Sequence, residues 1–171
     1  MSTIKTTNIT HGSNSGTSNL ILDSSGNLAV AGYITDSTMP YVMIGINANQ
    51  SVANATTHDI AWQEITDRSG NFNPTNGRFT APIAGDYLCN LSVQFTANID
   101  ALHTGIQKNG GNLGTNFDPW VNWGDSIRAG HISHVITCAV NDYITFHAFQ
   151  DTGSAKNLEA NRTKATIRFL G

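Results

Sequence analysis

The chain has 171 residues, of which only 12% are charged, and its formal net charge is -3. A chain of this length is enough for one sizeable core with an appendage. The lack of a basic field argues against binding to nucleic acid or anionic lipid, and no stretch has the roughly twenty apolar residues that a membrane span needs.

The first 18 residues are mostly Thr, Asn, Ser and Gly and offer almost nothing to bury. This composition predicts an extended arm over residues 1–18 that becomes ordered only against a partner. The opening MSTIKTTNITHGSNSG has one lysine and no apolar core, so we do not expect a signal peptide.

Two short apolar runs, NLILD and LAVAGYI, flank the turn residues SSGN. Apolar runs on either side of a Gly-containing turn predict a β-hairpin, followed by the linker DSTMP. Because an isolated hairpin is marginally stable in water, this one needs copies of itself or another domain to bury against. Residues 19–39 are therefore interpreted as an oligomeric stem with its linker.

Residues 40–171 contain many short apolar runs separated by Gly, Asn and Pro turns, and no window shows a sustained helical period. This pattern predicts an all-β sandwich, which we call the head. Polar loops are expected at 47–58, 112–130 and 150–161. Outside the central stretch analysed next, strands are expected at 41–46, 60–65, 102–108, 132–140, 143–149 and 163–170.

The stretch FNPTNGRFTAPIAGDYLCNLSV, residues 72–93, organises the head. Pro82 marks a corner because it cannot donate to a β-ladder, and Gly85 supplies a backbone conformation that side chains disfavour. Alternation then predicts a strand with one face on the core, broken only by Leu88. The residues on its core side are Tyr87, Cys89, Leu91, Val93 and Phe95.

The order of aromatic, Asn-Pro, Gly, Phe, Thr-Ala-Pro, Gly and Tyr in this stretch resembles the signature of the C1q-like globular head, a relative of the tumour necrosis factor (TNF) jelly roll. Later matches follow in the family's order, although Asn141 stands where the family usually has Gly. The resemblance covers roughly the last three-quarters of the chain. It is carried by Phe72, Gly77, Phe79, Pro82, Gly85, Tyr87, Lys108-Asn109-Gly110, Asn141-Asp142-Tyr143 and residues 166–171.

The resemblance implies a C1q/TNF-like jelly-roll β-sandwich that assembles as a homotrimer. In such a trimer, we expect apolar side chains to form the threefold interface and the stem hairpins to bury one another around the axis. The candidate interface residues are Tyr41, Tyr87, Phe146 and Phe149.

Both cysteines, Cys89 and Cys138, fall in expected strands among apolar neighbours. We favour two buried free thiols that pack as small hydrophobic groups. A disulfide would require adjacent strands, which the sequence alone does not establish, so this alternative stays open.

Three aromatic residues, Phe117, Trp120 and Trp123, lie in the expected polar loop 112–130. Aromatic side chains in a polar loop stack on the apolar faces of sugars or anchor a protein contact. The alternative is that they pack inward or against a neighbouring subunit. Both interpretations stay open.

We expect no metal, no cofactor and no catalysis. His131 and His134 are separated by an odd number of positions in one expected strand, which points them to opposite faces. Asp118 and Asp125 are candidate oxygen ligands for calcium of the kind that some C1q-like trimers hold, but an ordinary solvated loop is favoured. Gly124-Asp125-Ser126 resembles the opening of a family of serine hydrolases, yet no helix follows it, as that family requires.

The segment NLILDSSGNLAVAGYI resembles segments of bacteriophage tail-fibre and head-fibre proteins that precede a terminal knob. With the neutral polar surface, this favours a virion protein, located on the particle surface as a trimeric spike. We expect the arm to bind other virion proteins and the head to attach to a host-surface glycan or protein. The alternatives are a capsid decoration or cement protein without a receptor, and a bacterial carbohydrate-binding module or hydrolase.

Overall fold

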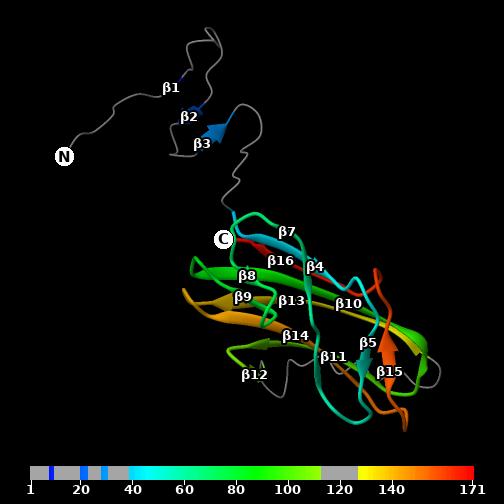
Figure 1. Cartoon of the computed structure of the whole chain (residues 1–171). Helices are drawn as coiled ribbons and strands as arrows, with labels where there is room; N and C mark the ends of the chain where they lie inside the picture. Colours follow the sequence, from blue (N-terminus) through cyan, green and yellow to red (C-terminus); the bar gives the residue numbers. More distant parts are fainter. Residues whose placement is uncertain (1–7, 10–19, 23–27, 31–38, 113–126) are drawn as a thin grey trace. The chain divides into compact units, whose positions relative to one another are not determined.

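The structure is a computed structural model and describes residues 8–9, 20–22, 28–30, 39–112 and 127–171 (Figure 1). The chain divides into two compact units, Met1–Ser37 and Thr38–Gly171. The elements of the described residues are all β-strands, and these residues include no helix able to cross a membrane.

The N-terminal unit contains an antiparallel sheet with the order β1-β2-β3. β2 (Leu20–Leu22) and β3 (Leu28–Val30) pair as the expected hairpin. β1 (Asn8–Ile9) pairs with β2, although the sequence predicted only an extended arm there. A strand of two residues is too short for any period to reveal it.

The first sheet of the head is built around the long strand β10 (Gly85–Ile99). β13 (Ile127–Cys138) pairs with one edge of β10 and β16 (Lys164–Phe169) with the other. The sheet continues from β16 through β4 (Tyr41–Gly45) to β7 (Gln63–Asp67). Two short strands, β15 (Lys156–Leu158) and β5 (Gln50–Val52), extend it beside Phe95.

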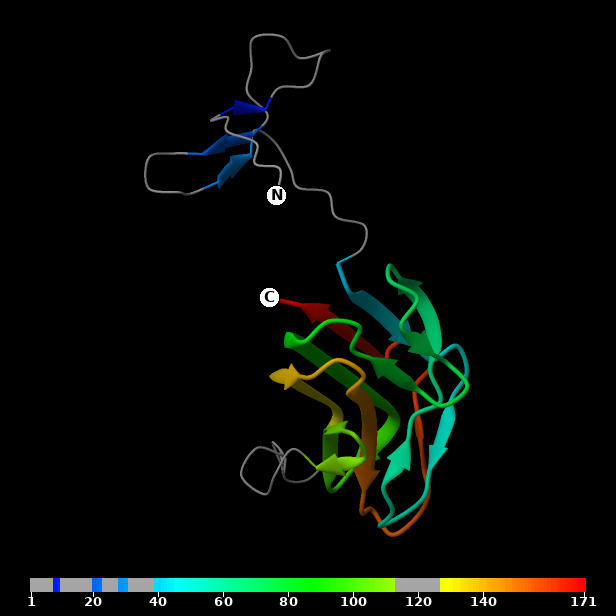
Figure 2. The ribbon, with the colours of Figure 1, turned by 90° about the vertical axis from the view of Figure 1, so that its left-hand side faces the viewer.

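The second sheet has the order β12-β11-β14-β9-β8. β14 (Tyr143–Gln150) lies between β11 (Leu102–Lys108) on one side and both β9 (Arg78–Thr80) and β6 (His58–Asp59) on the other. β12 (Gly111–Asn112) and β8 (Phe72–Asn73) are the outer strands. Figure 2 shows the two sheets of the head stacked as a sandwich.

The core lies between the two sheets, and β10 supplies its central row. All five residues predicted to face inward along this strand have no exposed surface. The Tyr87 ring packs against two aromatic rings, and its centroid lies 5.5 Å from that of Phe79 and 5.1 Å from that of Phe169. Its hydroxyl donates a 2.7 Å hydrogen bond to the Ile83 carbonyl, so the polar tip of the ring is satisfied as well.

Gly85 has the conformational role that the sequence predicted. Its φ is +147°, and a Cβ there would lie 2.6 Å from the carbonyl oxygen of Gly171. Gly171 is hydrogen-bonded to the start of β10, because the Asp86 amide donates to that same carbonyl at 2.9 Å. The absence of a side chain at Gly85 therefore makes room for the Gly171 backbone.

Asn109 and Asp142 join two turns at one end of the second sheet. The Asn109 side-chain Nδ2 donates to Asp142 Oδ1 at 2.7 Å, and the Ala139 backbone amide donates to Asp142 Oδ2 at 2.8 Å. Asn109 and Asn141 have φ values of +56° and +70°, which Asn tolerates better than most residues. This conformation explains why Asn141 replaces the usual Gly of the C1q signature.

Three of the expected loops contain strands. β5 lies in 47–58, where β6 also begins at His58, β15 lies in 150–161, and β13 begins at Ile127 rather than after residue 130. The three-residue strands β5 and β15 each bury one apolar side chain, Val52 and Leu158. Such short, mostly polar segments carry no detectable alternation, so the sequence indicated loops where pairing with β10 and β14 makes strands.

Replacing Asp142 tests the junction between the two turns. Hydrogen bonds from the Asn109 side chain and the Ala139 amide lower the pKa of Asp142. A lowered folded-state pKa gives stability that is present above the unfolded-state value and is lost as the pH falls through the folded value. We therefore expect Asp142→Asn to lower the free energy of unfolding at pH 7 more than at pH 2.5, as measured by urea titration.

The matched control is Asp100→Asn, because the Asp100 carboxylate makes no hydrogen bond or ion pair within the described residues. A stability difference between wild type and Asp142→Asn that is the same at both pH values would contradict this role for the carboxylate.

Candidate interaction surfaces

The side chains of β13, β10, β16 and β4 that point away from the core form a continuous surface, which we call the outer face. Strand register arranges it in rows across the sheet. Successive rows are Val135-Leu88-Arg168-Tyr41, Ser133-Asn90-Thr166-Met43 and His131-Ser92-Lys164-Gly45.

One end of the outer face carries four apolar side chains. Leu88 is half-buried beside Val135, whose side chain is 44% exposed. Tyr41 and Met43 are also half-buried, and the Arg68 guanidinium lies 5.2 Å from the centroid of the Tyr41 ring. The exposed Arg168 stands between Leu88 and Tyr41 in their row. Apolar side chains left partly exposed on a sheet are candidates for a contact surface, and we call these four apolar residues the apolar half.

Sequence reasoning missed most of the apolar half, although two signals were present. Leu88 was the only break in the alternation of β10, and an apolar residue on the polar phase of a strand is the expected sign of a second contact. Val135 carries the same sign, because it lies between Ser133 and Thr137 on the phase opposite to the buried Ile132 and Ile136.

The prediction that Tyr87 and Phe146 contribute to a subunit interface is wrong. Within the single chain their side chains are 0% and 2% exposed, so they have almost no surface to offer a second copy. Both belong to the core, where Tyr87 packs on Phe79 and Phe146 packs edge-on against Trp62. Aromatic character suits the core and an interface equally, and the sequence did not separate the two.

Tyr41 and Phe149 remain half-exposed, but they do not share a surface. Tyr41 lies on the outer face of the first sheet. Phe149 lies on the second sheet, with its ring centroid 5.0 Å from that of His103. A threefold contact joins two different faces of neighbouring copies, so the contribution of Tyr41 and Phe149 to a subunit interface stays a prediction.

The aromatic residues Phe117, Trp120 and Trp123 lie outside the described residues, as do the calcium candidates Asp118 and Asp125 and the hydrolase-like Ser126. The expectations for these side chains stay predictions.

The histidines in strand β13 point to opposite sides, as predicted. His131 is exposed on the outer face, and His134 is half-buried on the core side opposite Cys89. Burial lowers the pKa of both His58 and His103, which favours neutral imidazoles at pH 7. In the part of the chain that the structure describes, no three His, Cys, Asp or Glu side chains gather as metal ligands.

The two cysteines are buried and free, as favoured from the sequence. They lie on the paired strands β10 and β13, but Cys89 faces His134 whereas Cys138 faces Gly85. Burial raises the pKa of both thiols, that of Cys138 to about 11. Because the thiolate is the nucleophile, neither group is activated at neutral pH.

No family model and no curated protein matches this sequence. Solved structures do match. The vertex protein P5 of phage PRD1 superposes with a TM-score of 0.61 and 14% identity, covering 78% of this chain and 99% of that one. Eiger TNF from S. frugiperda gives 0.55 and 9%, covering 78% and 94%. The globular domain of zebrafish complement 1qA gives 0.53 and 15%, covering 77% and 96%.

These matches establish the fold. The head is a C1q/TNF-like jelly roll, as the signature in residues 72–87 predicted. At 15% identity or less, the likeness does not extend to activity or ligands.

Replacing Tyr87 with Phe tests its placement in the core. The substitution keeps the ring but removes the hydrogen bond to the Ile83 carbonyl. We expect the free energy of unfolding to fall by about 1 kcal/mol in a urea titration, with no change of native mass by light scattering. Unchanged stability with an altered native mass would contradict the core placement.

Proposed function

We propose that this protein is a bacteriophage virion protein that forms a trimeric spike and attaches the particle to a host surface. It acts by binding, without catalysis. The observation that carries the proposal is the fold shared with the PRD1 vertex protein P5 over 99% of that chain. The fibre-like hairpin unit that precedes the head supports the same reading.

The apolar half supports self-association. Leu88 is paired with the exposed Val135, Tyr41 ends the same row beyond Arg168, and Met43 lies in the next row. These two rows hold no acidic side chain. A second copy can cover the apolar side chains while the long Arg168 side chain keeps its charged end in solvent. The head therefore supplies at least one side of a subunit interface.

Two further segments of the chain have separate roles in this proposal. We assign residues 1–18 to the anchor on other virion proteins. The aromatic residues Phe117, Trp120 and Trp123 are assigned to a host-surface glycan or protein.

A capsid decoration protein without a receptor is the second candidate. The similar structure from PRD1 is a vertex protein, which favours a position on a shell. This candidate predicts saturable binding to empty capsids and no binding to cells. Attachment predicts binding to host cells and competition with infecting particles, and it fails if purified protein does neither.

Val135→Lys tests the apolar half as a subunit interface. A lysine at this exposed position should fold normally but bury a charge on assembly, which costs several times RT. We expect the wild-type chain to assemble and the variant to dissociate at a concentration at least tenfold higher, measured by light scattering during dilution. The matched control is Val140→Lys, because Val140 is similarly exposed but lies outside the outer face. Equal effects of the two substitutions would contradict this interface.

A further inference from the structure

Basic residues gather at the other end of the outer face, where β16 begins. Ser92 on β10 stands directly between His131 on β13 and Lys164 on β16. Directly opposite residues on paired strands have Cβ atoms about 5 Å apart, so a hydroxyl, an imidazole and an ammonium group share one row. His131 and Lys164 are exposed, and Ser92 is half-buried.

Two arginines outside this row lie near the turn before β16. The Arg128 guanidinium donates to the Phe95 and Thr96 carbonyls at 3.3 and 3.1 Å, where the pairing of β10 with β13 is interrupted. Arg162 lies two residues before Lys164 and is exposed. We call Ser92, Arg128, His131, Arg162 and Lys164 the basic patch.

One carboxylate, that of Glu159, lies beside the basic patch and already interacts with side chains around it. Glu159 accepts a 2.9 Å hydrogen bond from Gln94 and pairs with Arg128 at 3.5 Å and Arg162 at 3.3 Å. The Lys164 ammonium group makes no ion pair or hydrogen bond among the described residues. Three positive side chains therefore face one negative side chain, which leaves a local excess of positive charge on a chain whose net charge is -3.

We propose that the basic patch binds phosphate groups of a polymer on the host surface. This inference rests on the proposed attachment function and names the chemistry that the head recognises. The Ser92 hydroxyl, the Lys164 ammonium group and the free guanidinium nitrogens of Arg162 are hydrogen-bond donors, and the His131 ring adds another. Each phosphate group inside a polymer offers two unbridged oxygens, each able to accept more than one hydrogen bond, and guanidinium and ammonium groups are common donors to phosphate in proteins.

A repeating ligand suits an exposed patch of this kind. Single contacts between solvated charges are weak and screened by salt. A polymer presents many phosphates, and an assembly of heads presents several patches, so avidity raises the affinity without any new contact. Acidic residues elsewhere on the chain disfavour binding of the same polymer to other faces.

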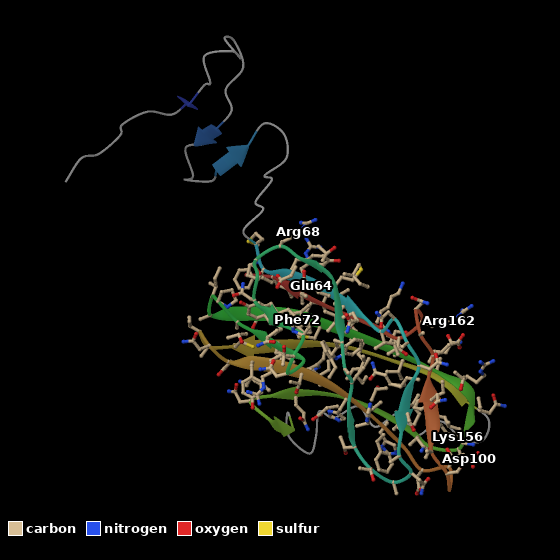
Figure 3. The ribbon with its side chains drawn as sticks, viewed as in Figure 1. Glu64, Arg68, Phe72, Asp100, Lys156 and Arg162 are labelled. Atoms are coloured by element: carbon tan, nitrogen blue, oxygen red, sulfur yellow. The ribbon has the colours of Figure 1, made fainter. Side chains whose placement is uncertain are left out.

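Inorganic polyphosphate is the probe, and binding to the full chain is measured by titration calorimetry at 50 and 150 mM salt. We expect Arg162→Gln combined with Lys164→Gln to weaken binding at least tenfold and to make the salt dependence shallower. The matched control combines Arg78→Gln with Lys156→Gln, which removes the same charge outside both the basic patch and the apolar half. Lys156 and Arg162 lie apart on the head (Figure 3).

Three results would overturn the proposal. They are no binding of polyphosphate at 50 mM salt, equal losses in the two double variants, and equal binding of a carboxylate polymer such as polygalacturonate.

Host-cell binding separates this proposal from the attachment function. If the protein binds polyphosphate through the patch but does not bind cells, the patch is supported and attachment is contradicted. If wild type and the Arg162→Gln, Lys164→Gln variant bind cells equally well, the patch is contradicted as the recognition site while attachment stands.

Discussion

The inward alternation along β10 is the constraint on which the rest of the head depends. Burying every second side chain from Tyr87 to Phe95 fixes which side of the first sheet meets the second. The same choice puts Leu88 and Ser92 on the outer face, and β13 and β16 follow because their residues pair with β10. A slip of one residue would exchange the two sets, so core and outer face are specified together.

Sequence reasoning recovered the features that depend on local chemistry. The β10 alternation, the Gly85 conformation and the fold were predictable, because each depends on a periodic or special residue within a short stretch. Sequence reasoning failed for features that depend on the register between paired strands. Nothing local separates a core aromatic such as Tyr87 from a surface aromatic such as Tyr41. The row of Ser92, His131 and Lys164 is assembled from three strands, so no spacing along the chain indicates it.

The outer face thus combines two chemistries on one sheet. Its apolar half suits contact with a second copy, and its basic patch suits an anionic ligand. Both depend on β10, but different residues carry them, so substitutions can separate assembly from recognition. In an assembled spike the two are linked through avidity, because each added copy contributes another patch.

Native mass tests the central claim, assembly through the head, most directly. Light scattering would compare the full chain with a shortened chain that begins at Met39, since residues 38–171 form a compact unit of their own. The account predicts three times the chain mass in both cases, relative to 18.3 kDa for the full chain. A single-chain mass for both, over the whole concentration range, would contradict it.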